Sequence, residues 1–150
     1  MKKIIILTAL LLVATTGIYA QKTMKSIFDR YADDERFSYV SVGKGAFNMI
    51  SSLGALSDVS SDEKEILANM TGLKILSLES DSTNKKLYNT LLSEVKAATS
   101  ANTHETLVEV REKGERTEIF VANDQSEMII ISKDDEDLSI IWLQGTPKKK

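Results

Sequence analysis

His104 is the one histidine of the chain, and it is the side chain best suited to acid–base or metal chemistry near neutral pH. A metal site built on imidazole normally uses two or three histidines, and a Ser-His-Asp arrangement needs a nucleophile and a carboxylate beside the ring. Its position at the start of a predicted strand favours a surface or strand-edge residue. Because the chain has no cysteine, disulfides, thiolate metal sites and cysteine nucleophiles are excluded.

Acidic residues form two runs, at residues 33–35 and 134–137. Carboxylate oxygens suit calcium, but neither run has the alternating spacing, inner glycine and distant glutamate of a calcium loop. We interpret both runs as solvated turns that keep sheet edges from pairing.

Glycine and serine motifs give no stronger indication of a reaction. The Gly-Lys-Gly at residues 43–45 lacks the longer pattern of a phosphate loop and is predicted to be a flexible strand-to-helix turn. The serine-hydrolase elbow and the zinc-protease motif are absent. We therefore predict no catalytic residues, no metal site and no cofactor, and a protein that is not an enzyme.

The first twenty residues have the three parts of a secretory signal peptide. Lys2 and Lys3 precede an apolar run at residues 4–13, and Ala20 is a small residue just before an expected cut at Gln21. The apolar run is too short for a convincing membrane span. We predict export to the periplasm or beyond the cell, no integral span in the mature form, and a single α+β domain at residues 21–150.

The charge of the chain argues against nucleic acid as a partner. The sequence has 19 basic and 22 acidic residues, a net charge of −3, which becomes −5 when Lys2 and Lys3 are removed. Binding to phosphate backbones depends on clustered lysine and arginine, and the sole basic run, residues 148–150, is most simply a solvated tail.

Hydrophobic periodicity predicts the elements that would position these residues. The first part alternates helix and strand, and the last part is a meander of four strands joined by short polar turns. The expected helices are residues 23–32, a segment from about 46, residues 62–70 and residues 83–98; the expected strands are 37–42, 73–79, 106–111, 117–122, 127–132 and 138–143. This order predicts an α+β two-layer sandwich, with a mostly antiparallel sheet of up to six strands and the helices packed on one face.

The meander strands carry apolar residues on both faces, which makes them the candidate interaction surface. One face is expected to pack on the helices, and the other is either an open apolar patch or is covered by the N-terminal helix or by closure of the sheet. The candidate surface residues are Leu107, Phe120, Ile129 and Ile141. We predict a non-enzymatic binding module whose partner is an unknown protein or a second copy; the alternatives are a small-ligand carrier or enzyme without a recognisable motif, or an accessory to envelope signalling.

The chain resembles the domain-of-unknown-function 4252 family of exported proteins, found chiefly in Bacteroidota. The likeness rests on the signal peptide, on Phe-Ser-Tyr-Val-Ser-Val-Gly-Lys-Gly-Ala-Phe-Asn-Met-Ile at residues 37–50, and on Gly-Leu-Lys-Ile-Leu at residues 72–76 before a long amphipathic helix. Many members resemble lipoproteins with a cysteine after the signal peptide, and this sequence lacks that cysteine. The resemblance implies an exported protein and no assigned activity, so no functional residue is carried over from it.

Overall fold

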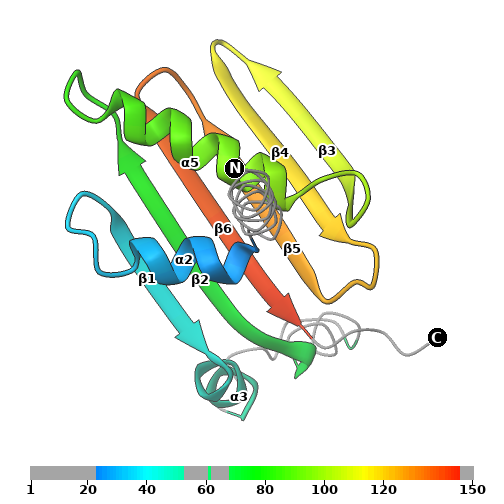
Figure 1. Ribbon diagram of the computed structural model, residues 1–150. Helices are drawn as coiled ribbons and strands as arrows, with labels where there is room; N and C mark the ends of the chain where they lie inside the picture. Colours follow the sequence, from blue (N-terminus) through cyan, green and yellow to red (C-terminus); the bar gives the residue numbers. More distant parts are fainter. Residues whose placement is uncertain (1–22, 53–60, 62–67, 146–150) are drawn as a thin grey trace, which may run out of the picture.

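Six antiparallel strands form one open sheet, and two helices lie across one of its faces (Figure 1). The computed structural model describes residues 23–52, 61 and 68–145. The strand order is β1-β2-β6-β5-β4-β3. The elements are α2 (Met24–Tyr31), β1 (Ser38–Gly43), α3 (Lys44–Ser52), β2 (Met70–Glu79), α5 (Lys85–Ala98), β3 (His104–Glu112), β4 (Glu115–Ala122), β5 (Glu127–Lys133) and β6 (Asp137–Gly145).

Helix α2 is short, and its first turn is held by a reciprocal cap. The Thr23 hydroxyl accepts from the backbone N–H of Ser26 at 3.2 Å, and the Ser26 hydroxyl accepts from the backbone N–H of Thr23 at 3.1 Å. This pairing satisfies N–H groups that have no partner within the helix. The apolar stripe then faces the sheet, and its four members are all buried: Met24, Ile27, Phe28 and Tyr31.

Helix α5 is the longer cover of the same face, which we call the inner face of the sheet. Tyr88, Leu91 and Val95 recur at helical spacing and are buried against the strands. An ion pair joins the two helices, since Arg30 Nη1 lies 2.8 Å from Glu94 Oε1. The core between helices and sheet includes Leu76, Leu78, Ile129, Ile131, Leu138, Ile140 and Trp142.

The predicted fold class is confirmed, with α2 and α5 on one face and the four-strand meander. The strand predicted at residues 73–79 is an inner strand, β2, because β6 returns across the sheet to pair with it. In β1 the structure decides between two registers: Phe37 and Tyr39 pack on the core, whereas Val40 is 45% exposed. None of the helices within the described ranges is long and apolar enough to cross a bilayer.

Two boundary predictions are wrong. At Gly-Lys-Gly the chain changes from strand to helix as predicted, but it has no separate turn there, because Gly43 ends β1 and Lys44 begins α3 directly. Met70, predicted to be a buried helix residue, is the first residue of β2, and Gly72 lies within that strand rather than ending a helix. A side chain at Gly72 would meet the Gln144 side chain, with its Cβ 2.6 Å from Oε1, so here glycine permits close packing between β2 and β6. Most of the helix predicted at residues 62–70, and the signal peptide, fall outside the described residues.

Candidate interaction surface

The sheet face opposite α2 and α5, called the outer face below, carries an apolar row that crosses all six strands. Its members are direct cross-strand partners, in the order Val40, Ile75, Ile141, Ile130, Ile119 and Val108. The four isoleucines are half-buried, and the two valines at the sheet edges are more than 40% exposed. Side chains directly opposite each other on antiparallel strands contact one another, so the row forms a continuous ridge.

Two further rows flank the apolar ridge. On one side lie Val42, Leu73, Leu143, Met128 and Val121, again as successive cross-strand partners. On the other side lie Ser38, Ser77, Ser139, Ser132 and Thr117, and hydroxyl contacts join Ser77 to Ser139 at 3.1 Å and Thr117 to Ser132 at 3.3 Å. The ridge and the serine row contain no charged residue, and the second row meets one at its β3 end, where Glu105 lies opposite Val121. Uncharged surface of this breadth is unusual on the exterior of a protein and is typical of an interaction site.

Negative charge gathers beyond the serine row, at one end of the outer face. Glu79 is paired with Asp137 and Glu112 with Glu115, and all four residues are exposed. The adjoining turn adds Asp134, whose pKa is lowered because the backbone N–H groups of Asp137 and Glu136 donate to its carboxylate. The outer face therefore has an acidic border at this end.

A shallow apolar hollow lies at the other end of the outer face. Its volume is about 300 Å³, and it is lined by Val121, Met128 and Leu143 from the second row. Gln125 and Gly145 also line it. A hollow with this lining suits one apolar side chain of a partner.

The structure separates the four candidate surface residues that the sequence indicated. Ile141 lies in the middle of the apolar ridge, and Leu107 is 50% exposed on β3. Phe120 and Ile129 are instead buried on the inner face, where Ile129 is 0% exposed, so neither belongs to the surface. The sequence could not show which of these residues face the helices, because β4, β5 and β6 have apolar residues at consecutive positions. In such strands apolar and polar residues do not alternate, so the buried face cannot be recognised.

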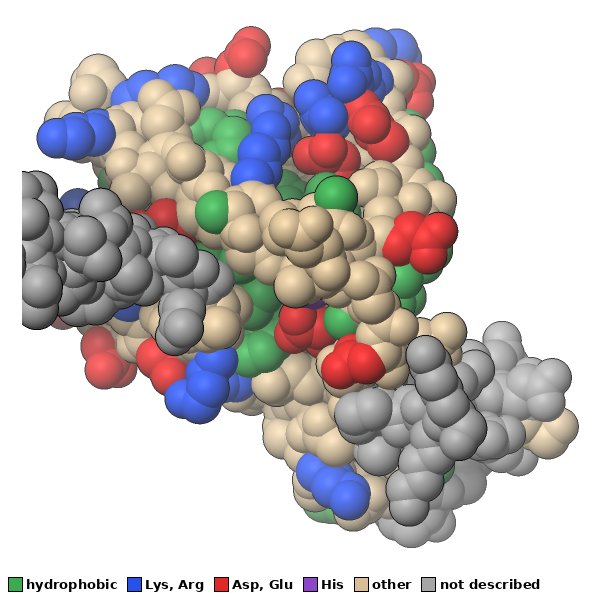
Figure 2. Space-filling model, turned by 45° about the vertical axis from the view of Figure 1, so that its right-hand side comes forward, with side chains coloured by type: hydrophobic (Ala, Val, Ile, Leu, Met, Phe, Trp, Pro, Cys, Tyr) green, Lys and Arg blue, Asp and Glu red, His purple; other side chains and the backbone are tan. Residues whose placement is uncertain are grey.

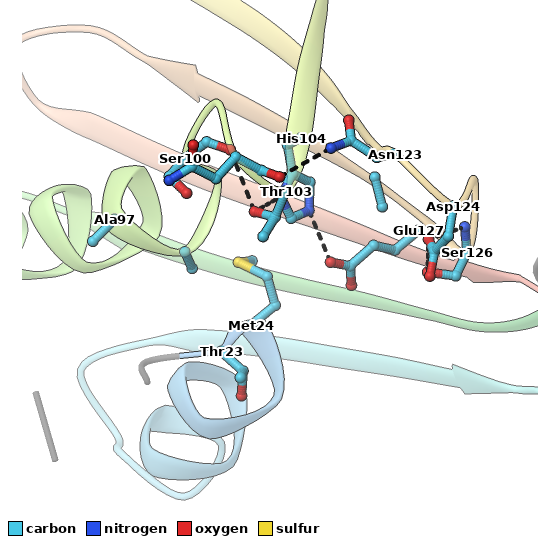
Figure 3. Close-up of a pocket in the computed structure, with 13 residues that line it drawn as sticks. Thr23, Met24, Ala97, Ser100, Thr103, His104, Asn123, Asp124, Ser126 and Glu127 are labelled. Carbon is cyan, nitrogen blue, oxygen red and sulfur yellow. Dashed lines mark hydrogen bonds and ion pairs between the residues drawn. The ribbon is translucent and has the colours of Figure 1, made fainter. Parts of the chain in front are cut away.

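His104 begins the edge strand β3, as one of the two sequence-based expectations has it, but its side chain is buried rather than at the surface (Figure 3). Its Nε2 lies 2.9 Å from Glu127 Oε1, and its Nδ1 lies 2.7 Å from the Thr103 hydroxyl. The other carboxylate oxygen of Glu127 accepts from Trp142 Nε1 at 2.6 Å. These contacts connect the start of β3 to β5 and β6, and we call the four side chains the His104 cluster.

The order hydroxyl, imidazole, carboxylate in the His104 cluster is also the order of a catalytic triad. Three members of the cluster, Thr103, His104 and Glu127, line a pocket of about 660 Å³ between the start of α2, the end of α5 and the β4–β5 turn, and Met24 lies across from them (Figure 3). However, both ring nitrogens and both carboxylate oxygens already have protein partners, and the Thr103 hydroxyl also lies 3.3 Å from the Ser100 carbonyl oxygen. This satisfied network has the character of a structural latch. Among the described residues, no group of three or more potential metal ligands is found.

Sequence reasoning missed both the isoleucine ridge and the Glu127–Trp142 contact. The ridge depends on the register of five strand pairs. The only related feature of the sequence was the apolar content of the strands, which does not give their register. His104 and Glu127 are 23 residues apart, and Trp142 is a further 15 residues along the chain. No pattern in the sequence predicts that these three side chains contact one another.

Comparisons with known proteins identify a family but no activity. A family model described as "Domain of unknown function (DUF4252)" matches residues 31–149, a range that includes every strand of the sheet. Among solved structures, the crystal structure of a DUF4853 family protein from Actinomyces odontolyticus is similar, with 11% sequence identity and a TM-score of 0.30. That similarity covers 70% of this chain and 66% of the other chain. No curated protein matches the chain.

Proposed function

We propose, from the premise that this chain belongs to the DUF4252 family, that it is an exported protein that binds another protein through the outer face of its sheet. The observation that carries the proposal is the uncharged apolar ridge, which crosses six strands on the face opposite α2 and α5. The same side chains do not serve the core, because the core is built from the inner face.

The two ends of the outer face define the chemistry of the partner. An apolar side chain of the partner would occupy the hollow at Leu143, and lysine or arginine would meet the acidic border at Asp137. These two residues are six positions apart on β6, which corresponds to about 20 Å at the usual rise per strand residue. We therefore expect a partner surface that is apolar along its length and basic at one end.

Charging the ridge tests this function. Ile141→Lys places an ammonium group in the middle of the apolar row, where a bound partner would have to desolvate it. The matched control is Ala101→Lys, since Ala101 is exposed in the loop before β3. Each tagged variant would be crosslinked in living cells, and the crosslinked peptides identified by mass spectrometry. We expect one partner, crosslinked to outer-face residues, to be recovered with the wild type and with Ala101→Lys and lost with Ile141→Lys.

Circular dichroism would first establish that both variants fold. Equal recovery of the partner with Ile141→Lys, or crosslinks that map to α2 and α5, would contradict the proposal. A partner peptide without a basic residue near the crosslink would contradict the assigned chemistry but not the assigned face.

Export is the second part of the proposal and is supported by the signal-peptide pattern in the first twenty residues. Fractionation of cells that produce the full chain, followed by mass determination of the purified protein, tests it. We expect the protein outside the cytoplasm, with the mass of a chain that starts at Gln21. Full-length protein in the cytoplasm would contradict this part.

A further inference from the structure

Strand β3 is an edge of the sheet at which no other strand of the described ranges pairs, and it is unusually exposed. Eight of its nine residues are exposed, including Leu107 at 50%, Val108 at 42% and Val110 at 50%. Figure 1 shows β3 at the margin of the sheet, and Figure 2, which brings this side forward, shows hydrophobic side chains between charged ones along the right-hand margin of the molecule. An edge strand with apolar side chains and unpaired backbone groups is a template for pairing with another strand.

A bulge divides β3 into two parts. The pairing with β4 shifts register between Thr106 and Val108, so regular pairing is restored from Val108 to Glu112. Because bulges interrupt pairing on an edge, the segment at residues 108–112 is the part available to a further strand. Within it, Val108, Val110 and Glu112 lie on the outer face, and Glu109 and Arg111 lie on the inner face, opposite Glu118 and Arg116.

When two copies of this segment lie antiparallel, the charges of one are complementary to the charges of the other. If two copies of β3 pair antiparallel about Val110, Arg111 of each copy lies opposite Glu109 of the other, and the two Val110 side chains lie opposite each other. Moving the centre to Glu109 would place the two Glu109 carboxylates together, and moving it to Arg111 would place the two guanidinium groups together. Opposite charges directly across a strand pair stabilise it and like charges destabilise it, so of these three registers the Val110 register has the most favourable charge pairing.

We propose that the occupant of the β3 edge is a second copy of this chain, paired antiparallel about Val110 in a two-fold dimer. The proposal goes beyond the partner-binding function and uses a different surface. The intramolecular pairs Arg111–Glu109 and Arg116–Glu109 already hold these side chains on the inner face, with Arg116 Nη2 3.1 Å from Glu109 Oε1. In the dimer the two segments would form one network of alternating charges on the inner face. On the outer face the Val110 pair would lie between the two apolar ridges, with Val108 of each copy opposite Glu112 of the other.

The other edge strand, β1, gives no comparable register because Ser38–Gly43 contains no charged residue. A β3–β3 contact is also symmetric and therefore closes after two copies, whereas a β3–β1 contact would continue into a fibre. The paired segment is short compared with stable interfaces, which bury about 1,200–2,000 Å². We therefore expect a weak dimer whose population rises with protein concentration.

Sedimentation velocity over a concentration series, with two charge-reversal variants, tests the register. Arg111→Glu places two glutamates opposite each other at both contacts of a homodimer, and Glu109→Arg places two arginines there. Each variant alone should weaken dimerisation by about tenfold or more. An equimolar mixture should restore it, because every glutamate of one variant then faces an arginine of the other. Lys86→Glu on the exposed side of α5 is the charge control and should dimerise like the wild type.

Val110→Lys is a second disrupting variant that leaves the Glu109 and Arg111 contacts within the chain unchanged, and circular dichroism establishes that each variant folds. A wild type that stays monomeric throughout the series would overturn the proposal, as would dimerisation of Arg111→Glu at wild-type strength or a mixture that stays monomeric. Ile141→Lys separates this proposal from the proposed function, because it should abolish partner binding and leave the dimer intact. Loss of the dimer in Ile141→Lys but not in Val110→Lys would place the second copy on the outer face and overturn the edge assignment.

Discussion

Glu127 is the residue that connects three strands through its carboxylate. One oxygen faces His104 Nε2 and the other accepts from Trp142 Nε1, and the side chain is 23% exposed. Replacing the carboxylate with an amide of the same shape, Glu127→Gln, turns two hydrogen bonds to a charged group into neutral ones. It also leaves one acceptor oxygen in place of two, so both contacts persist only if the His104 ring accepts at Nε2. Hydrogen bonds to a charged group contribute more to stability than neutral ones, so we expect urea unfolding at neutral pH to show a loss of about 1–2 kcal/mol.

Glu105→Gln is the control for that measurement, since Glu105 is exposed on β3 and has the same charge. We expect its free energy of unfolding to lie within about 0.5 kcal/mol of the wild type, as is usual for surface substitutions. If Glu127→Gln behaves like Glu105→Gln, the His104 cluster is not a latch, and the pocket beside it becomes the first place to search for a ligand.

Single residues were the hardest part of this protein to predict from sequence. The solitary histidine was the natural place to look for chemistry, yet its environment depends on Thr103 next to it and on a glutamate two strands away. His104 is buried because of the strand order, which decides which residues lie around it. Strand order produces no periodic pattern in the sequence, so it could not be predicted from periodicity. The helix stripes were easier, because the buried positions of α2 recur at helical spacing.

Strand β5 shows how one element divides its side chains between two different tasks. Ile131 is 0% exposed beneath the helices, and its neighbour Ile130 lies half-buried in the outer ridge. We expect Ile131→Ala to cost about 2–5 kcal/mol because it leaves a cavity in a packed core. Ile130→Ala should cost at most about half as much, since part of its surface already contacts water. Chemical denaturation of the two variants checks the assignment of faces, and equal losses would mean that something covers the outer face in the isolated protein.

Elements were predicted well in number and type and less well at their ends. Alternating or continuous apolar runs indicated every strand of the sheet, and the amphipathic stripes indicated α2 and α5. The errors came where a residue that commonly ends a helix or strand lies inside a strand that is held by pairing with its neighbours. Gly72 suggested the end of a helix, but pairing of its strand with β1 and β6 carries the backbone through that residue as part of β2. Glycine therefore marked close packing there rather than a boundary.

The strand order of the whole molecule determines which surfaces remain for function. With β1 and β3 at the edges and β2, β6, β5 and β4 between them, the sheet has one face under helices, one apolar face and two edges with which no other described strand pairs. A wide apolar face with an acidic border and a charged, self-complementary edge suit different partners. They are also compatible, because pairing at the β3 edge would extend the outer face without covering it.

Hydrogen exchange on the monomeric Arg111→Glu variant tests this arrangement over the whole sheet. Amides of β2 and β6 are bonded to neighbours on both sides and lie over the buried core, so they should open only with global unfolding and exchange most slowly. Amides of β3 have one neighbouring strand and exposed side chains, so they should exchange fastest among the strands. In the wild type, protection at residues 108–112 should rise with protein concentration while protection of β2 and β6 stays unchanged. If the amides of β3 exchange as slowly as those of β6 in dilute Arg111→Glu, the β3 edge is covered within one chain. In that case β3 would have no free edge with which a second copy could pair.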